Sequence, residues 1–138
     1  MAKFSKQITK GDDDAKNLII EALAGNVTGG FDIDSIYKMG DKYIVLEFLK
    51  CETVRPNDSH PKRYWFKNAQ KFISLWHITQ KLEGILYLIN YEDSREQFKL
   101  IKVLALDENG IQKEEIALWD FKKFSEWFQL LNKKSIDL

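Results

Sequence analysis

Two carboxylates lie close together in the most hydrophobic part of the chain. Asp34 precedes one apolar segment, and Glu47 stands in the middle of the next, with apolar residues on both sides. An ionised glutamate in such a strand costs several kcal/mol unless it is paired, hydrogen-bonded or bound to a metal. Glu47 therefore needs a partner, and Asp34 is a candidate to share a metal ion with it.

The two segments have the pattern of an antiparallel hairpin. Strands are expected at 31–39 and 42–51, joined by a tight turn at Gly40. Alternate residues of a strand share a face, and in this hairpin Asp34 lies across from the neighbourhood of Glu47. The two carboxylates can then converge on one divalent ion, and with water and phosphate oxygens they make the oxygen-rich ligand set that Mg²⁺ prefers.

The remaining segments supply the elements that would position this pair. Apolar residues recur every three or four positions in the helical segments, and they run continuously in the strands. Helices are expected at 13–24, at 66–82 and from Asp120 onward, and further strands at 85–91, at 98–106 and, as a short edge strand, at 111–117. A strand, a helix and a strand in succession normally form a parallel crossover. These patterns predict a single α/β (α+β) domain over 1–138, with a mixed sheet flanked by helices in the order α-β-β-α-β-β-α.

Composition limits the class of protein. A chain of 138 residues that is 44% hydrophobic can bury one core. The 21 basic and 21 acidic residues cancel, which leaves only a local patch as a possible contact for nucleic acid. Cys51 is the only cysteine, so an intramolecular disulfide is excluded and a reducing compartment is favoured. The first residues lack the apolar core of a signal peptide and no stretch could span a membrane, so we expect a cytoplasmic protein with no membrane partner.

Cations and aromatic residues are interleaved in the loop expected at 52–65 and at the start of the next helix. Such a surface can neutralise phosphates and stack on exposed bases. The candidate nucleic-acid-binding residues are Arg55, Lys62, Arg63, Tyr64, Trp65 and Lys67. Alternatively, the aromatic residues anchor the loop to the core and the cations are merely solvated.

Other kinds of site find less support. No pair of histidines has the spacing of a zinc site, no glycine-rich phosphate loop is present, and no Ser or Cys has the surroundings of a nucleophile. His77 is interpreted as a residue of the 66–82 helix rather than a ligand. Trp119 and Trp127 could cover a partner surface if they are exposed, which leaves a homodimer through the last helix as a possibility.

Asp34, Glu47 on the adjacent strand and Lys50, followed by a helix with polar residues near its start, resemble the PD-(D/E)XK nuclease superfamily. That superfamily includes Holliday-junction resolvases and restriction endonucleases, and the resemblance covers residues 13–106 in element order. It implies a restriction-endonuclease-like three-layer core and hydrolysis of phosphodiester bonds in duplex or branched DNA. By this resemblance, Asp34 and Glu47 would hold Mg²⁺ or Mn²⁺, and the lysine would orient the attacking water.

The lysine departs from the spacing of that superfamily, because Lys50 comes three residues after Glu47 instead of two. On a regular strand Lys50 would face away from Glu47, and a β-bulge near Phe48 or Leu49 would be needed to bring both to one side. Alternatively, the lysine comes from the following helix, or the chain is a catalytically inactive module with a nuclease fold that binds nucleic acid or a protein. The candidates on that helix are Lys67 and Lys71 together with Gln70, and Glu21 of the first helix occupies the place of an accessory acid.

Overall fold

The chain is an α+β protein built on a mixed sheet. The computed structural model describes residues 13–137, and within them it contains three α-helices, five strands and two 3₁₀ helices. The α-helices are α1 (Asp14–Leu23), α2 (Trp65–Lys81) and α3 (Phe121–Ile136), and the 3₁₀ helices are η2 (Pro56–Asp58) and η3 (Pro61–Tyr64). The strands are β1 (Ser35–Met39), β2 (Lys42–Lys50), β3 (Ile85–Tyr91), β4 (Phe98–Asp107) and β5 (Gly110–Trp119). Residues 1–12 and residue 138 lie outside the described part.

The strands follow one another across the sheet in the order β1-β2-β3-β4-β5. Strands β2 and β3 run parallel and are joined by α2, as the strand-helix-strand pattern predicts. The other neighbouring strands are antiparallel. Neighbouring strands of the sheet therefore run in opposite directions, except for β2 and β3, which α2 connects.

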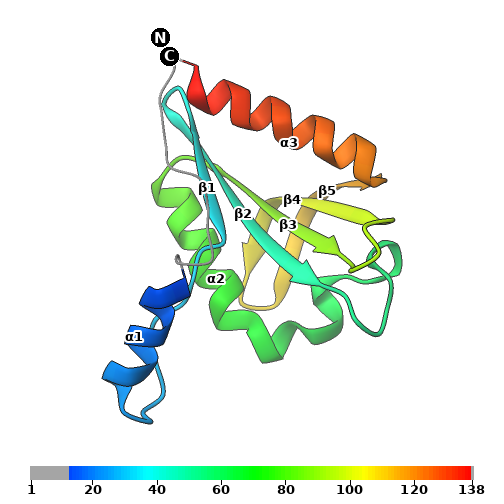
Figure 1. Cartoon of the computed structure of the whole chain (residues 1–138). Helices are drawn as coiled ribbons and strands as arrows, with labels where there is room; N and C mark the ends of the chain where they lie inside the picture. The colour runs from blue at the N-terminus through cyan, green and yellow to red at the C-terminus, as the bar shows by residue number, and fades with distance from the viewer. Residues whose placement is uncertain (1–12, 138) are drawn as a thin grey trace.

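Two helices cover opposite faces of the sheet (Figure 1). The core on one face joins Val45, Leu88 and Ile101 of the sheet to Phe72 and other apolar residues of α2. A second core, on the other face, joins Ile44, Leu46, Ile89 and Leu100 to Leu131 of α3. The protein thus has three layers, and residues that alternate along β2 belong alternately to the two cores.

The close approach of β2 and β3 begins at Gly84. A Cβ at this position would overlap the backbone carbonyl oxygen of Tyr43, so the residue that ends the α2 connection must lack a side chain. Gly84 also donates its backbone N–H to the carbonyl oxygen of Thr79, over a distance of 2.9 Å. Gly84 therefore both follows the end of α2 and permits the parallel pairing of β2 and β3.

Some boundaries differ from those expected. Strand β1 begins at Ser35 rather than at Phe31, because the backbone N–H of Phe48 donates to the side chain of Asp34, at 2.7 Å. Helix α2 begins one residue early, at Trp65. Strand β5 is an edge strand, as expected, but it is longer than expected: it has 10 residues and pairs with β4 from Gly110 to Trp119, with register shifts near Ala105.

Helix α1 stands apart from the sheet. Its apolar residues Leu18, Ile19 and Ile20 are all exposed, and none of its residues is buried. Figure 1 shows it projecting beside the sheet, past the start of β1. Among the described helices, none is long and apolar enough to cross a membrane.

Trp119 and Trp127 belong to the layer between β5 and α3. Their rings lie 5.8 Å apart, and both side chains are half-buried. Trp127 also packs edge-on against Tyr87 of β3, with 5.3 Å between the ring centres. The two tryptophans therefore fix α3 to the sheet and are not the exposed pair that a dimer surface would need.

Candidate functional site

Glu47 lies in the interior of the protein, on the face of β2 that α2 covers. Only 2% of its surface is exposed, and β2 is flanked by strands on both sides. Glu47 is therefore not on the solvated face of an edge strand. The register that pairs Ser35 with Leu46 places Asp34 directly across from Glu47. The two carboxylates come together as the hairpin pattern predicts.

A lysine of α2 completes this cluster. The Nζ of Lys71 lies 3.0 Å from Oε2 of Glu47. That oxygen is fully buried, and among the described residues it receives no hydrogen bond of good geometry, so the ion pair with Lys71 is its main polar contact. Glu47 thus keeps an acceptor that could bind a further group.

The surroundings of Glu47 favour its protonated form. Burial is the largest cause, and together with the neighbouring Asp34 it raises the pKa of Glu47 to about 8, although Lys71 acts in the opposite direction. Burial and Asp34 thus favour retention of a proton by Glu47 when no further cation is bound, whereas Lys71 favours the ionised carboxylate. A divalent cation beside it would favour the ionised form and release that proton.

Lys50 does not share a face with Glu47. Strand β2 pairs with β3 in unbroken register from Ile44 to Lys50, so the bulge that would turn Lys50 toward Glu47 is absent. The Nζ of Lys50 lies 3.1 Å from Asp93 and 3.8 Å from Glu52. The cation beside Glu47 is instead supplied by α2, which was the other possibility raised by the sequence.

A pocket of about 230 Å³ gives access to this cluster. Glu47 and Lys71 line it together with Tyr64 and Asn68. Lys50 also borders the pocket, although its ammonium is paired with Asp93. The pocket could therefore admit water or a phosphate oxygen to the buried carboxylate.

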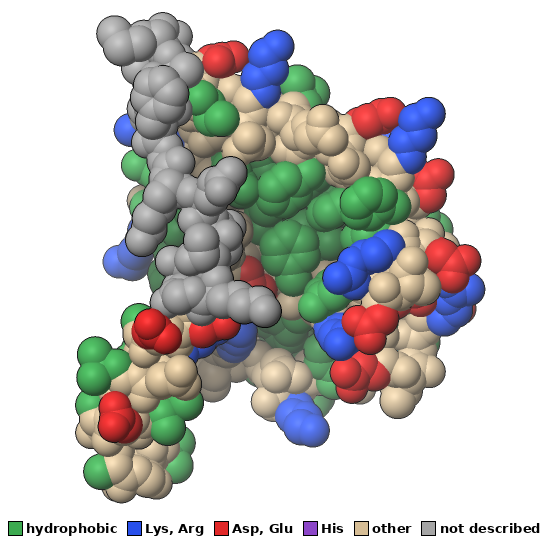
Figure 2. Space-filling view, in the orientation of Figure 1, with side chains coloured by type: hydrophobic (Ala, Val, Ile, Leu, Met, Phe, Trp, Pro, Cys, Tyr) green, Lys and Arg blue, Asp and Glu red, His purple; other side chains and the backbone are tan. Residues whose placement is uncertain are grey.

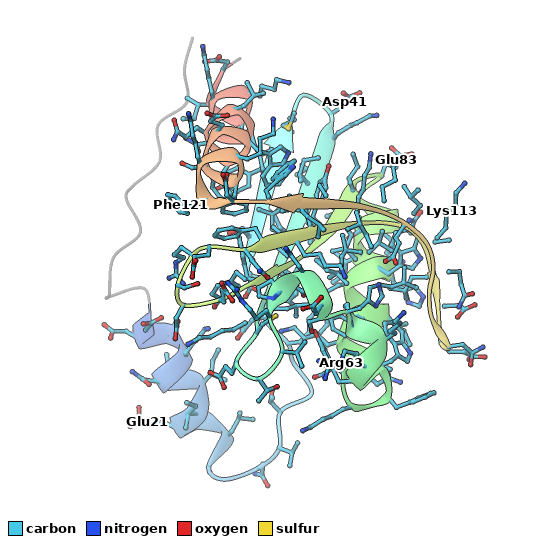
Figure 3. All side chains as sticks on the ribbon, turned by 90° about the vertical axis from the view of Figure 1, so that its right-hand side faces the viewer. Glu21, Asp41, Arg63, Glu83, Lys113 and Phe121 are labelled. Atoms are coloured by element: carbon cyan, nitrogen blue, oxygen red, sulfur yellow. The ribbon has the colours of Figure 1, made fainter. Side chains whose placement is uncertain are left out.

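The two accessory candidates do not join the cluster. Glu21 is exposed on α1, and Figure 3 shows it far to one side of α2. Gln70 is exposed on α2, next to Lys71 in the sequence, and no contact joins it to Glu47 within residues 13–137. The structure thus brings together Asp34, Glu47 and Lys71.

The aromatic residues expected to stack on nucleic acid are mostly part of the core. Trp65 is 3% exposed, stacks on Phe72 at 5.4 Å, and donates its ring N–H to the carbonyl oxygen of Glu108. Tyr64 is half-buried beside the same phenylalanine. The assignment of Trp65 to a stacking surface is therefore corrected. The exposed aromatic residue is Phe66, at 86%, whose helical position points away from the side that carries Trp65 and Phe72.

The cations of this region fall into two groups. Lys62, Arg63 and Lys67 are exposed around the start of α2, where they could contact phosphates. Arg55 instead forms two hydrogen bonds, of 3.1 and 2.7 Å, with the buried carboxylate of Glu92. Arg55 is therefore a structural residue in the described part of the chain.

The loop before α2 is held by buried polar contacts that the sequence does not indicate. Lys99 and Asn90 both donate to the carbonyl oxygen of Ser59, at 2.9 Å. The Nε2 of His60 lies 2.8 Å from a carboxylate oxygen of Glu114 on β5. These contacts hold the loop between β2 and α2 against the sheet, so that the exposed cations of the loop project from a fixed backbone.

Arg55→Met is expected to reduce the acid sensitivity of the fold. Arg55 is the largest cause that lowers the pKa of Glu92 to about 2, below its ordinary value. The stabilisation is complete above the unfolded pKa and is lost as pH falls through about 2, because the unfolded state binds the proton first. Urea unfolding between pH 5 and 2.5 should therefore show a smaller loss of stability in Arg55→Met than in the wild type. Arg63→Met removes an exposed cation and should keep the wild-type slope; equal slopes in all three proteins would contradict the assignment.

Comparison of the chain with protein-family models, curated proteins and solved structures finds no match. The site is therefore interpreted from its own geometry. Within residues 13–137, no group of three or more His, Cys, Asp or Glu side chains is placed to hold a metal ion. A cation at Asp34 and Glu47 would have two carboxylates as side-chain ligands and would complete its coordination with other oxygens.

Proposed function

We propose that this chain is a Mg²⁺-dependent endonuclease-like protein that hydrolyses phosphodiester bonds of DNA, on a restriction-endonuclease-like core of the PD-(D/E)XK type. The observation that carries the proposal is the convergence of Asp34, which directly precedes β1, with Glu47 of β2 and Lys71 of α2 around the buried Glu47 carboxylate. Two acids on neighbouring strands and a lysine are the groups that such a nuclease needs. In this chain the lysine is Lys71, and it comes from α2 and not from β2.

The donor set fits a hard cation. Mg²⁺ is commonly bound by one or two carboxylates and keeps several waters, which substrate phosphate oxygens can replace. Glu47 has a buried oxygen 3.0 Å from the ammonium of Lys71, and Asp34 lies across the strand pair, near enough to raise the pKa of Glu47. When bound, the ion would supply positive charge to the phosphate and lower the pKa of a bound water. Mn²⁺ has similar ligand preferences and should substitute.

The protein residues would position the reacting groups. Rigid strands on both sides of Glu47 hold its carboxylate in place, and a hydrogen bond from the backbone of Phe48 holds that of Asp34. The ammonium of Lys71 reaches the same point from α2 and can orient a water and stabilise negative charge that develops on the phosphate. Electrostatic interactions with Glu47 are strengthened because its carboxylate is shielded from solvent.

A binding module without catalysis is the alternative. It is favoured by the exposed ring of Phe66 next to the exposed cations Lys62, Arg63 and Lys67. An aromatic ring among cations suits nucleic acid, because it can stack on a base while the cations neutralise phosphates. In that case DNA would bind to this surface and remain intact.

Cleavage of plasmid and branched DNA tests the proposal. Purified protein is expected to nick or cut DNA with Mg²⁺ or Mn²⁺ and to leave it intact in EDTA. Asp34→Asn should abolish this activity and weaken Mn²⁺ binding measured by calorimetry, because it removes one of the two ligands. Asp32→Asn is the matched control, since Asp32 carries the same charge two residues away and is exposed beside Lys16. Full activity in Asp34→Asn would refute the assignment, and intact DNA that is nevertheless bound would favour the binding module.

A further inference from the structure

A second, larger pocket lies under the start of α3, on the other face of the sheet. Its volume is about 540 Å³, within the range of small-molecule sites. Its walls are aromatic except for two charged residues. The lining residues are Phe48, Tyr91, Phe98, Phe121 and Phe124, with Asp34 and Arg95. Figure 2 shows hydrophobic side chains gathered in the middle of this face below α3, with Lys or Arg side chains beside them.

The aromatic rings pack against one another; Phe98 is buried, at 3% exposed, and the rings nearer the surface are only partly covered. Phe98 and Phe124 stack with ring centres 4.4 Å apart and planes 4° from parallel. Phe48 meets Tyr91 edge-on at 6.2 Å. Phe121 is 51% exposed at the first position of α3. Pre-oriented rings with uncovered faces form a platform on which a flat aromatic ligand can stack.

Arg95 is held beside this platform by a strained turn. Its backbone φ is +62°, a left-handed value that is unfavourable for a residue with a side chain and that persists only where the surroundings impose it. The turn is fixed because Nη1 of Arg95 donates to the carbonyl oxygen of Glu92, and the Glu92 side chain is itself held by Arg55 and Ser94. The guanidinium lies 5.6 Å from the ring centre of Tyr91.

The guanidinium keeps donors that could bind an anion. Only Nη1 of Arg95 makes hydrogen bonds within the described residues, and its nearest acid is Asp93, at 4.0 Å. A guanidinium binds phosphate oxygens through several parallel hydrogen bonds. Because Asp34, which also lines the pocket, repels a phosphate and Arg95 attracts it, the phosphate of a ligand with a flat ring should lie at Arg95.

The pocket is next to the candidate cleavage site. Asp34 lines this pocket and is also the register partner of Glu47, and Phe48 lines both pockets. The two pockets thus lie on opposite faces of the same end of β2. A DNA strand with one nucleotide in this pocket would continue past Asp34.

We propose that this pocket binds a single unpaired nucleotide, with its base stacked against the aromatic rings and its phosphate on Arg95. A base inside a duplex is stacked on both sides and reaches such a pocket only after leaving the helix. One part of the inference rests on the proposed function: if the chain cuts DNA, its preferred substrate is DNA with an unpaired nucleotide near the cut, as in branched DNA. The binding site itself depends only on the pocket.

Binding of 2′-deoxyadenosine 5′-monophosphate, measured by calorimetry in EDTA, tests the site without cleavage. Phe121→Ala and Arg95→Asn are each expected to weaken binding by about tenfold, the first through loss of stacking and the second through loss of the cation. Asparagine is chosen because it tolerates the left-handed backbone of Arg95, although the hydrogen bond from Nη1 to the carbonyl oxygen of Glu92 is lost with the guanidinium. Lys113→Asn removes an equal charge from an exposed position on β5, far from α3, and should bind as the wild type does (Figure 3).

The outcomes separate this inference from the proposed function. Absent binding, unchanged binding in both variants, or binding no tighter than that of inorganic phosphate overturns the nucleotide site. Nucleotide binding in a protein that cuts no DNA supports the site and refutes the nuclease. If DNA is cut, the wild type should prefer duplexes with one unpaired nucleotide over fully paired ones, and Phe121→Ala should lose that preference; no preference in the wild type overturns the narrowing of the substrate.

Discussion

Lys71→Met is expected to lower the rate of Mg²⁺-dependent DNA cleavage by about 10²- to 10³-fold, the loss typical when one pre-organised charge is removed from a transition state. Lys71 lies 3.0 Å from Glu47 and is the cation that the structure places beside the carboxylate pair. Methionine retains much of the length and the apolar contacts of lysine, so the charge is the main change. The measurement is a single-turnover cleavage rate at saturating metal.

Lys50→Met is the matched control for this prediction. It removes the lysine nearest in sequence to Glu47, but its ammonium is paired with Asp93 on the other side of β2. Although Lys50 borders the same pocket, its ammonium is already paired with Asp93 and Glu52, so its removal should lower the cleavage rate far less than that of Lys71. The opposite pattern, with a large loss in Lys50→Met and none in Lys71→Met, would assign the water-orienting role to Lys50.

The fold of Lys71→Met can be checked through the pH dependence of its stability. The folded pKa of Glu47 is about 8, above its ordinary value of 4.5, so the folded state holds a proton that the unfolded state has already lost between these values. Stability from this group is therefore present at low pH and decreases as pH rises from about 4.5 toward 8. Loss of Lys71 should extend this decrease to higher pH, while the variant remains folded at pH 6.

The carboxylate pair could be predicted from the sequence because a hairpin has few geometric choices. Once the turn is placed at Gly40, the period of two decides which residue lies opposite Glu47. The partner lysine could not be chosen in the same way. Lys67 and Lys71 are one helical turn apart, and which of them reaches the strand depends on how α2 sits on the sheet. That orientation is set by tertiary packing, which hydrophobic periodicity does not give.

The pattern of polar and apolar residues also failed to predict two features that depend on contacts made by side chains. Asp34 accepts the N–H of Phe48, so β1 starts later than its apolar residues indicate. Arg55 lies in a basic, aromatic segment and was expected to contact a phosphate, yet its side chain binds Glu92, 37 residues later. In both cases the deciding partner is distant in sequence, and a single sequence carries no record of such pairs.

Trp65→Ala is expected to lower the free energy of unfolding by about 3 to 5 kcal/mol, as is typical of large-to-small substitutions of buried aromatic residues. The indole is 3% exposed, stacks on Phe72 and donates to a backbone carbonyl, so its loss leaves both a cavity and an unpaired acceptor. Urea unfolding measures the loss. Any weakening of DNA binding in this variant should follow the unfolded fraction.

Phe66→Ala provides the comparison at the next position of α2. The ring is 86% exposed, so its removal should change the free energy of unfolding by no more than about 0.5 kcal/mol. If Phe66 contacts a base, DNA affinity should fall by roughly 5-fold or more in a fully folded protein, as stacking contributions indicate. A stable Trp65→Ala protein with weakened DNA binding would show instead that Trp65 reaches the DNA, and the packing of α2 on the sheet would have to be reconsidered.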